Sequence, residues 1–382
     1  MSEKYIHRAV INEFKRKLKP NKVLILLGAR RVGKTALINK FIENIPTSDY
    51  LLLNGEDLQT LSILEERSVE NYKRLIGSAK ILIIDEAQKI PEIGLKLKLI
   101  VDEIKGIKVI ATGSSVFDLS NSLGEPLVGR ENTLRLYPLA QMEFVKEEGF
   151  LDTVNKLEER LLFGGYPELE QYTDWNDKAD YLEGIVNSYL LKDILAYDKI
   201  KKADKIIDLL KLIAFQVGKE VSIDELANSL KGISRNTVEN YLDLLSKVFI
   251  IYKVKGYSKN LRKEVTKSNR WYFYDNGIRN AIIRNFNKLN FRNDIGELWE
   301  NYLMSERIKH NSYKNIRINQ YFWRTYDQQE IDLIEEEATQ VSAYEFKWNH
   351  KKKVKAPRGW KNAYPDASFK TINKENYLDF IV

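Results

Sequence analysis

A glycine-rich segment at residues 28–35 has the residue types of a loop that binds phosphate. It reads Gly-Ala-Arg-Arg-Val-Gly-Lys-Thr, directly follows the apolar run at 22–27, and precedes apolar residues at helical spacing up to Pro46. Between a strand and a helix, the N–H groups of such a loop cradle phosphates. Lys34 then reaches the β- and γ-phosphates, and the Thr35 hydroxyl coordinates Mg²⁺. The segment therefore predicts a site for ATP and Mg²⁺, with these nucleotide-binding residues: Gly28, Ala29, Arg30, Arg31, Val32, Gly33, Lys34, Thr35 and Ala36.

Two adjacent carboxylates, Asp85 and Glu86, end a second apolar run at 81–84. We expect Asp85 to hold the Mg²⁺ through water and Glu86 to polarise the water that attacks the γ-phosphate. Such a pair could also merely mark the end of a strand. Together with the loop at 28–35, the pair predicts hydrolysis as well as binding.

Two further polar residues follow a third strand-like run at 108–112. Ser114 could contact the γ-phosphate or the attacking water, and with equal weight it or Ser115 could cap a helix. Arg130 precedes the strand-like residues 134–138. From the sequence alone, Arg130 could simply form an ion pair at the surface.

These motifs resemble a known family when they are taken in order. The succession GARRVGKT, ILIIDEAQKIP, ATGSS, LVGR and LRLYPL is similar to the archaeal and bacterial AAA+ ATPases whose C-terminal half is a poorly characterised restriction-endonuclease-like domain. The resemblance implies that Ser114 takes the sensor position and that Arg130 is an arginine finger. An arginine finger acts on the nucleotide of a neighbouring subunit, which implies a homo-oligomeric ring such as a hexamer. The Gly-Gly-Tyr-Pro segment at 164–167 extends the resemblance into a helical lid.

Residues 219–256 predict a helix-turn-helix that continues into a β ribbon. A helix capped by Ser222 is followed by a glycine turn, a second helix from Arg235 and a strand-like run from Phe249. In this winged helix-turn-helix, the start of the second helix and the ribbon contact nucleic acid. The same fold also serves as a protein-docking module, and that alternative stays open. The predicted DNA-binding residues are Arg235, Asn236, Thr237, Lys253, Lys255, Lys259, Arg262 and Lys263.

The charge of the chain is concentrated in this part of the sequence. The 382 residues carry a formal charge of +7, and residues 201–270 alone hold 15 Lys and Arg against 8 Asp and Glu. A concentrated positive segment is typical of proteins that bind nucleic acid. The charge distribution therefore favours DNA as a partner.

A third group of polar residues lies near the C-terminus. Glu345 and Lys347 are two apart on a strand-like run and share a face, and a hairpin could place Asp332 beside them. Two carboxylates bind Mg²⁺, and the lysine can orient or activate water for attack on a phosphodiester. Glu300, or less favourably Glu297, could complete the site from a helix.

The order of these residues resembles the core of PD-(D/E)xK nucleases. The stretches GELWENYL, WRTYDQQEIDLI and YEFKW also match the C-terminal part of the AAA+ family named above. The resemblance implies a nuclease-like fold. It leaves open whether that fold cleaves DNA or only binds it.

The whole pattern predicts an α/β protein of four segments: an AAA+ P-loop ATPase core with a parallel sheet (1–150), a helical lid (151–215), a winged helix-turn-helix (216–270) and a restriction-endonuclease-like α/β domain (271–382). The absence of cysteine excludes disulfides, thiol catalysis and Cys-ligated zinc. Apolar runs too short for a bilayer and an N-terminus without a signal peptide predict a cytoplasmic protein with no membrane partner. Two functions compete. One is a DNA-acting ATPase, and the other is a nucleotide-switched regulator or scaffold whose nuclease-like fold is inactive.

Overall fold

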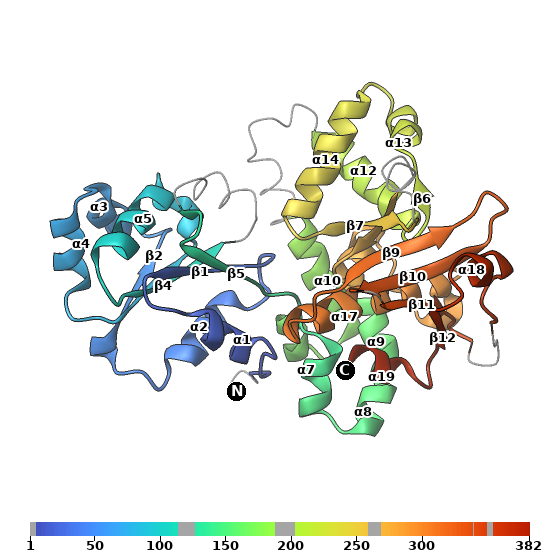
Figure 1. Ribbon diagram of the computed structural model, residues 1–382, viewed down its shortest axis with the longest axis horizontal. Helices are drawn as coiled ribbons and strands as arrows, with labels where there is room; N and C mark the ends of the chain where they lie inside the picture. Colours follow the sequence, from blue (N-terminus) through green and yellow to red (C-terminus); the bar gives the residue numbers. More distant parts are fainter. Residues whose placement is uncertain (1–4, 114–126, 188–202, 259–268, 339, 350–353) are drawn as a thin grey trace. The chain divides into compact units, whose positions relative to one another are not determined.

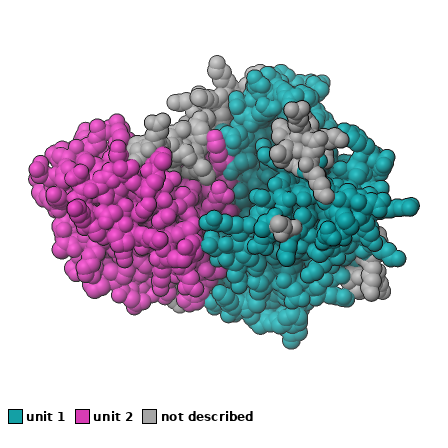
Figure 2. Space-filling view, in the orientation of Figure 1, with its two compact units in different colours: residues 1–6, 138–246, 250–382 teal, residues 7–137, 247–249 magenta. Residues whose placement is uncertain are grey.

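The computed structural model describes residues 5–113, 127–187, 203–258, 269–338, 340–349 and 354–382 (Figure 1). The chain forms two compact units, which are coloured separately in Figure 2. The smaller unit comprises residues 7–137 and 247–249, and the larger one comprises residues 1–6, 138–246 and 250–382. Each unit has its own sheet. The four-segment division remains a prediction.

The smaller unit is built on a parallel sheet whose described strands follow the order β2-β3-β4-β1-β5. The bounds are β1 (Lys22–Leu27), β2 (Tyr50–Asn54), β3 (Ile81–Asp85), β4 (Lys108–Gly113) and β5 (Glu131–Arg135). All its strand pairs are parallel. The inner strands are buried almost throughout, as uninterrupted apolar runs require when helices cover both faces. This finding confirms the predicted parallel-sheet core.

Short helices alternate with these strands. Their bounds are α1 (Ile11–Lys17), α2 (Lys34–Ile42), η1 (Thr47–Asp49), α3 (Leu58–Glu65), α4 (Val69–Ile76), η2 (Ala87–Lys89) and α5 (Ile93–Glu103). Polar side chains begin two of them: Asp57 accepts from the Gln59 N–H at 3.1 Å, and Ser68 accepts from the Asn71 N–H at 3.1 Å. Each bond satisfies a backbone donor that the first helical turn leaves open. The sheet order places β4 between β1 and β3, so the carboxyl ends of these three strands meet.

The larger unit contains a mixed sheet whose described strands follow the order β12-β11-β10-β9-β7-β8-β6. The bounds are β6 (Glu220–Val221), β7 (Ile251–Gly256), β8 (Asn269–Phe273), β9 (Asn319–Arg324), β10 (Glu330–Glu337), β11 (Gln340–Phe346) and β12 (Ser368–Ile372). Its pairs are antiparallel except for the parallel pairs β7·β9 and β11·β12. Because β7 pairs with β9, one sheet joins the predicted helix-turn-helix segment to the predicted nuclease-like segment.

Helices surround this sheet. Their bounds are α7 (Gln141–Glu147), α8 (Phe150–Asn155), α9 (Leu157–Phe163), η4 (Pro167–Gln171), α10 (Trp175–Ile185), α12 (Ala203–Phe215), α13 (Ile223–Leu230), α14 (Arg235–Lys247), α16 (Asn276–Ile282), η6 (Leu289–Phe291), α17 (Ile295–Tyr313), α18 (Arg358–Ala363) and α19 (Tyr377–Ile381). None of the described helices is both long enough and apolar enough to cross a membrane.

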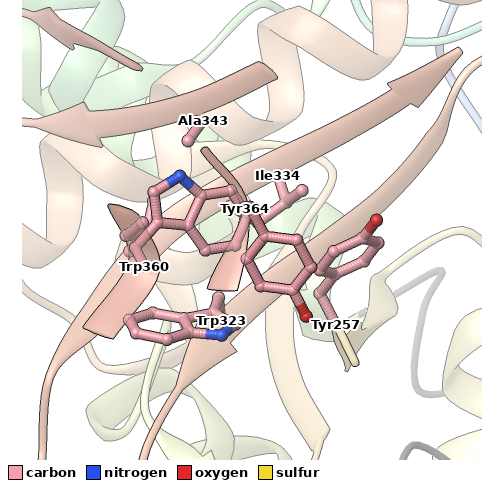
Figure 3. Packing of buried hydrophobic residues seen from close by; sticks show 7 residues of the cluster. Tyr257, Trp323, Ile334, Ala343, Trp360 and Tyr364 are labelled. Carbon is pink, nitrogen blue, oxygen red and sulfur yellow. The ribbon is translucent and has the colours of Figure 1, made fainter. Parts of the chain in front are cut away.

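Aromatic packing fixes the junction between β7 and β9. Tyr257, the residue after β7, donates its N–H to the Phe322 carbonyl at 2.7 Å and packs with Trp360 and Tyr364 (Figure 3). The ring centroids of Trp360 and Tyr364 lie 4.3 Å apart, and Trp323 meets Trp360 edge-on at 5.3 Å. Aromatic pairs of this geometry add to the stability gained by burying their area. The end of β7 is therefore part of the C-terminal core.

The Gly-Gly pair at 164–165 ends α9 where the backbone passes close to Asp275. Gly164 has a φ of 72°, and the Gly165 N–H donates to the Asp275 carboxylate at 2.8 Å. A Cβ on Gly164 would lie 2.1 Å from Asp275 Oδ1, and one on Gly165 would lie 2.3 Å from the Leu139 carbonyl oxygen. Both positions therefore require glycine, which gives the Gly-Gly-Tyr-Pro segment a structural role.

Replacement of Gly164 by alanine should destabilise the larger unit by at least about 2 kcal/mol, because the new methyl would overlap a buried carboxylate and the left-handed backbone is strained for alanine. The free energy of unfolding from denaturant titration measures this loss. Gly184→Ala is the matched control, since a Cβ there meets no atom within 4 Å and Gly184 lies in α10. Equal stability of the two variants would contradict the assigned role of Gly164.

Candidate functional site

The loop between β1 and α2 has the backbone that phosphate binding requires. A Cβ on Gly28 would lie 2.2 Å from the Leu136 carbonyl oxygen, so this position admits only glycine. Gly33 begins α2 with a φ of 91°, a conformation that glycine adopts without strain. The buried Lys34 side chain donates from Nζ to the carbonyl oxygens of Gly28 at 3.0 Å and Ala29 at 3.1 Å. Its ammonium group therefore lies over the loop.

A buried arginine outside the motif supports the same loop. Arg8 donates to the Val32 carbonyl at 2.7 Å and to the Tyr137 carbonyl at 2.6 Å. It is 4% exposed and ties the loop to the residues that follow β5. Sequence reasoning missed Arg8, because an arginine upstream of the first strand carries no local signal of such a contact.

Thr35, Asp85 and Thr112 form a chain of hydrogen bonds at the carboxyl ends of β1, β3 and β4. The Thr35 hydroxyl donates to Asp85 Oδ2 at 2.7 Å, and the Thr112 hydroxyl donates to Asp85 Oδ1 at 2.5 Å. Thr112 also accepts from the Glu86 N–H at 2.9 Å. The Thr35 hydroxyl and the Asp85 carboxylate are hard oxygen ligands beside a phosphate-binding loop, and this donor set fits Mg²⁺. The Thr112 hydroxyl thus contacts both the Asp85 carboxylate and the backbone of Glu86.

The carboxylate of Glu86 is held beside this chain by Gln88. The Gln88 amide donates to Glu86 Oε2 at 2.6 Å. Glu86 itself has a φ of 50°, a left-handed conformation that costs a non-glycine residue about 1 kcal/mol or more. Glu86 follows Asp85 in the chain, and its own carboxylate accepts a hydrogen bond from the Gln88 amide.

The other residues predicted for hydrolysis have different outcomes. Ser114 lies outside the described residues. Arg130 lies just before β5, where its Nε contacts Asp102 Oδ1 at 2.6 Å, and this hydrogen bond raises the pKa of the guanidinium. The ion-pair alternative therefore describes the observed contact, while the arginine-finger role stays a prediction. Thr112 was missed by sequence reasoning, although it is the one polar residue in the apolar run of β4 after Lys108.

The predicted DNA-binding residues of α14 carry little free positive charge. Arg235 contacts Asp224 Oδ2 at 2.9 Å and Glu239 Oε1 at 3.1 Å, both at the surface. Thr237 donates its N–H to the Ser234 hydroxyl at 3.2 Å, which caps the helix. Asn236 is exposed beside them. The charge of Arg235 is therefore shared with two carboxylates.

Strand β7 presents two lysines on one exposed face. Lys253 and Lys255 alternate with the buried residues Tyr252 and Val254, as the two-residue period of a strand requires. The Lys253 ammonium also lies 6.0 Å from the centroid of the Trp271 ring. The predicted contacts Lys259, Arg262 and Lys263 lie outside the described residues. In the described part of the chain, the predicted DNA-binding surface thus draws its positive charge mainly from these two lysines.

The C-terminal carboxylates come together around a residue that was not predicted. Glu300 from α17 and Asp332 from β10 both face Arg270 of β8, whose Nη1 lies 3.7 Å from Glu300 Oε1 and 3.9 Å from Asp332 Oδ1. The Tyr272 hydroxyl donates to Glu300 Oε1 at 2.6 Å. On β11, Lys347 Nζ contacts Glu345 Oε1 at 2.6 Å. We call Arg270, Glu300, Glu330, Asp332, Glu345 and Lys347 the carboxylate cluster.

Burial and mutual repulsion raise the pKa values of Glu300, Asp332 and Glu345. Burial, followed by the charge of Asp332, raises the pKa of Glu300 to about 8 and that of Glu345 to about 7. Burial likewise raises the pKa of Asp332, although a hydrogen bond from the Phe346 N–H at 2.7 Å opposes it. Near neutral pH the Glu300 carboxyl is therefore largely protonated and can donate a hydrogen bond.

The cluster does not fit a divalent metal as it is arranged. Asp332 Oδ2 accepts from the Phe346 N–H, and Glu345 Oε1 is taken by Lys347. Among the described residues, no group of three His, Cys, Asp or Glu side chains is placed to hold a metal ion. The structure brings Glu300, Asp332 and Glu345 into one region, as predicted. Their role as metal ligands stays a prediction.

Three known families match successive parts of the chain. Residues 20–145 match an AAA domain, residues 154–289 a domain of unknown function (DUF8612), and residues 295–378 another domain of unknown function (DUF4143). The chain therefore combines an AAA-type ATPase domain with a DUF4143 C-terminal domain. The loop and the Thr35–Asp85–Thr112 chain both lie within the AAA match.

Several relatives are similar over most of their length. An uncharacterized protein of Methanocaldococcus jannaschii is 26% identical over 375 residues, covering 94% of this chain and 82% of its own. Uncharacterized proteins of Haemophilus influenzae (24% identical, 84% and 80% covered) and Mycobacterium tuberculosis (25% identical, 85% and 70% covered) also match. The similarity thus extends over most of these archaeal and bacterial proteins, which are uncharacterized.

Solved structures resemble the chain only distantly. A structure of Drosophila ORC bound to DNA has a TM-score of 0.25 at 15% identity and covers 71% of this chain and 92% of its own. Pif1 helicase from Candida albicans has a TM-score of 0.27 at 17% identity and covers 47% of each chain. Similarity this low carries no argument about function.

The raised pKa of Glu300 predicts a pH-dependent stability. Because the pKa of about 8 in the fold lies above the usual 4.5, the folded state holds the extra proton, and the stability gained from it is lost as the pH rises through about 8. Glu300→Gln should therefore show a smaller fall in melting temperature than the unmodified protein between roughly pH 5 and pH 9.

Glu337→Gln is the matched control, because Glu337 is exposed at the end of the same strand as Asp332. It should retain the pH profile of the unmodified protein. If Glu300→Gln also retained that profile, the Glu300 carboxyl would not hold its proton in the fold.

Proposed function

We propose that the protein is a Mg²⁺-dependent ATP hydrolase. The observation that carries this proposal is the hydrogen-bonded chain of Thr35, Asp85 and Thr112 beside the phosphate-binding loop. The match of residues 20–145 to an AAA domain supports it. The loop binds phosphates through its N–H groups, and Lys34 exchanges its carbonyl partners for phosphate oxygens when nucleotide enters.

Hydrolysis depends on where the two carboxylates lie. The Mg²⁺ that accompanies ATP supplies positive charge at the phosphates, and Thr35 and Asp85 are the residues that would hold it. Glu86 polarises the attacking water as general base. Its carboxylate is bound by Gln88, so this amide must release Glu86, or turn with it, before the water is activated. Thr112 orients both acids, because its hydroxyl donates to the Asp85 carboxylate and accepts from the Glu86 N–H.

Glu86→Gln should lower the rate of ATP hydrolysis by at least about 100-fold while nucleotide binding is retained, because the amide cannot accept the proton of water. Phosphate release and binding of a fluorescent ATP analogue measure the two effects. Lys34→Ala should lose binding as well. Undiminished hydrolysis by Glu86→Gln would remove Glu86 from the mechanism.

Thr112 offers an isosteric check on the same site. Thr112→Val keeps the shape of the side chain but loses both hydrogen bonds, so hydrolysis should slow by about tenfold or more. Thr112→Ser keeps the hydroxyl and is expected to retain most of the activity. Equal rates for the two variants would mean that the hydroxyl has no orienting role.

We further infer that DNA is the macromolecular partner. Helices α13 and α14 followed by the antiparallel pair β7·β8 have the order of a winged helix-turn-helix. Lys253 and Lys255 extend from the exposed face of the ribbon, and residues 201–270 carry the excess positive charge of the chain. Contacts from these lysines to phosphate would position the protein without reading sequence.

A second candidate is a nucleotide-switched regulator in which the same helices bind protein. The ion pairs of Arg235 with Asp224 and Glu239 favour it, because a guanidinium that already contacts two carboxylates contributes less to attracting phosphate. In either case, nucleotide would bias the conformation of the larger unit. ATP hydrolysis that is stimulated by DNA supports the first function, and indifference to DNA supports the second.

Two parts of the sequence prediction lie beyond this proposal. A ring would require Arg130 to exchange Asp102 for the nucleotide of a neighbouring copy. DNA cleavage would require a divalent ion among carboxylates that already surround Arg270. The ATPase activity proposed for the smaller unit depends on neither.

Charge reversal of Lys253 and Lys255 to glutamate should weaken DNA binding. Each phosphate contact contributes about 0.9 to the slope of log affinity against log salt concentration, so that slope should fall by about 2. Fluorescence anisotropy with duplex DNA at several salt concentrations measures both quantities. Reversal of the exposed Lys361 and Lys370 is the control, and it should leave the salt slope unchanged. An unchanged slope in the β7 variant would favour the protein-binding function.

A further inference from the structure

Arg270 is a buried cation among acids from two different elements. It is 4% exposed, and its Nη2 contacts Glu330 Oε2 at 2.9 Å, while Nη1 faces Glu300 and Asp332 at 3.7 and 3.9 Å. Its guanidinium also lies 4.6 Å from the centroid of the Phe322 ring. A guanidinium keeps its charge throughout the accessible pH range. The cluster therefore contains a permanent positive charge of its own.

The remaining polar atoms show that the carboxylate cluster is not saturated. In the described part of the chain, Arg270 Nε and Glu345 Oε2 are buried and have no hydrogen-bond partner. Glu345 is 7% exposed, so its second oxygen is shielded from bulk solvent. Buried groups of this kind call for a ligand, a water or a counter-ion. Glu345 Oε2 is thus an acceptor that a cation could use if the charge of the cluster allowed one to enter.

We propose that Arg270, with Lys347 beside Glu345, takes the place of a divalent ion in the carboxylate cluster, and that the Arg270 guanidinium excludes divalent ions from Asp332. A divalent ion bound to the Asp332 carboxylate would lie within a few ångströms of the guanidinium. Coulomb repulsion between such charges is weakly screened in a buried site, so it opposes the attraction that the acids would exert on the ion. Removal of the guanidinium should therefore create a divalent-cation site.

The strand pairing around Arg270 keeps its guanidinium within the carboxylate cluster. β8 is paired on both sides, with β7 through Val254 and with β6 through Glu220. Arg270 cannot leave the cluster unless this part of the sheet shifts or its side chain turns against Phe322. The proposal does not depend on the ATPase function, because every group in it belongs to the larger unit.

Calorimetric titration of the nucleotide-free protein with Mn²⁺ tests the proposal. The unmodified protein and Asp332→Asn should bind Mn²⁺ alike, because neither has an available site in the cluster. Arg270→Gln should gain one Mn²⁺ site and a melting temperature that rises with Mn²⁺. The double variant Arg270→Gln, Asp332→Asn should lose both. Arg324→Gln is the matched control, since Arg324 of β9 contacts Glu220 of β6 at 3.7 Å and lies outside the carboxylate cluster.

Binding of Mn²⁺ by the unmodified protein that disappears in Asp332→Asn would overturn the proposal, and so would a folded Arg270→Gln that gains no site. If Arg270→Gln fails to fold, Arg270→Lys keeps a cation at this position. That variant should remain as insensitive to Mn²⁺ as the unmodified protein, and a gain of Asp332-dependent binding would count against the proposal. ATPase variants at Glu86 leave this test unaffected, so the two proposals fail separately.

Discussion

The insertion of β4 between β1 and β3 is the constraint on which the nucleotide site depends. Parallel strands bring their carboxyl ends to one edge of a sheet, so the loop after β1, Asp85 after β3 and Thr112 near the end of β4 meet there. The hydroxyl of Thr112 then bonds Asp85 and the backbone of Glu86 together. With another strand order, these residues would not lie close enough to one another to form the site.

The sequence predicts this half of the protein well because its signals are local. A strand, a glycine loop and a helix lie within 22–42, and the backbone of Gly28 and Gly33 has the geometry that their residue type suggests. Thr112, Arg8 and Gln88 could not be assigned in this way. Their contacts depend on residues from 2 to 129 positions away, and most of these pairings follow from the sheet order rather than from a motif.

The C-terminal site shows the opposite case. The spacing of Glu345 and Lys347 correctly indicates that they share a face, since their side chains contact each other. Arg270 could not be found from the sequence, because it lies 62 residues before Asp332 and was assigned to a different predicted segment. Only the pairing of β7 with both β8 and β9 brings these residues together. Local pattern therefore predicted the acids and Lys347 but not Arg270, which faces Glu300 and Asp332.

The parallel pair β7·β9 also determines where the polypeptide can be divided. A fragment that began at residue 271 would leave β9 as an open sheet edge, with N–H and C=O groups ready to pair with another copy. It would also remove Tyr257 from its aromatic neighbours and leave the buried Asp332 carboxylate without the guanidinium that faces it. The residues on either side of position 270 therefore share one sheet and one compact unit.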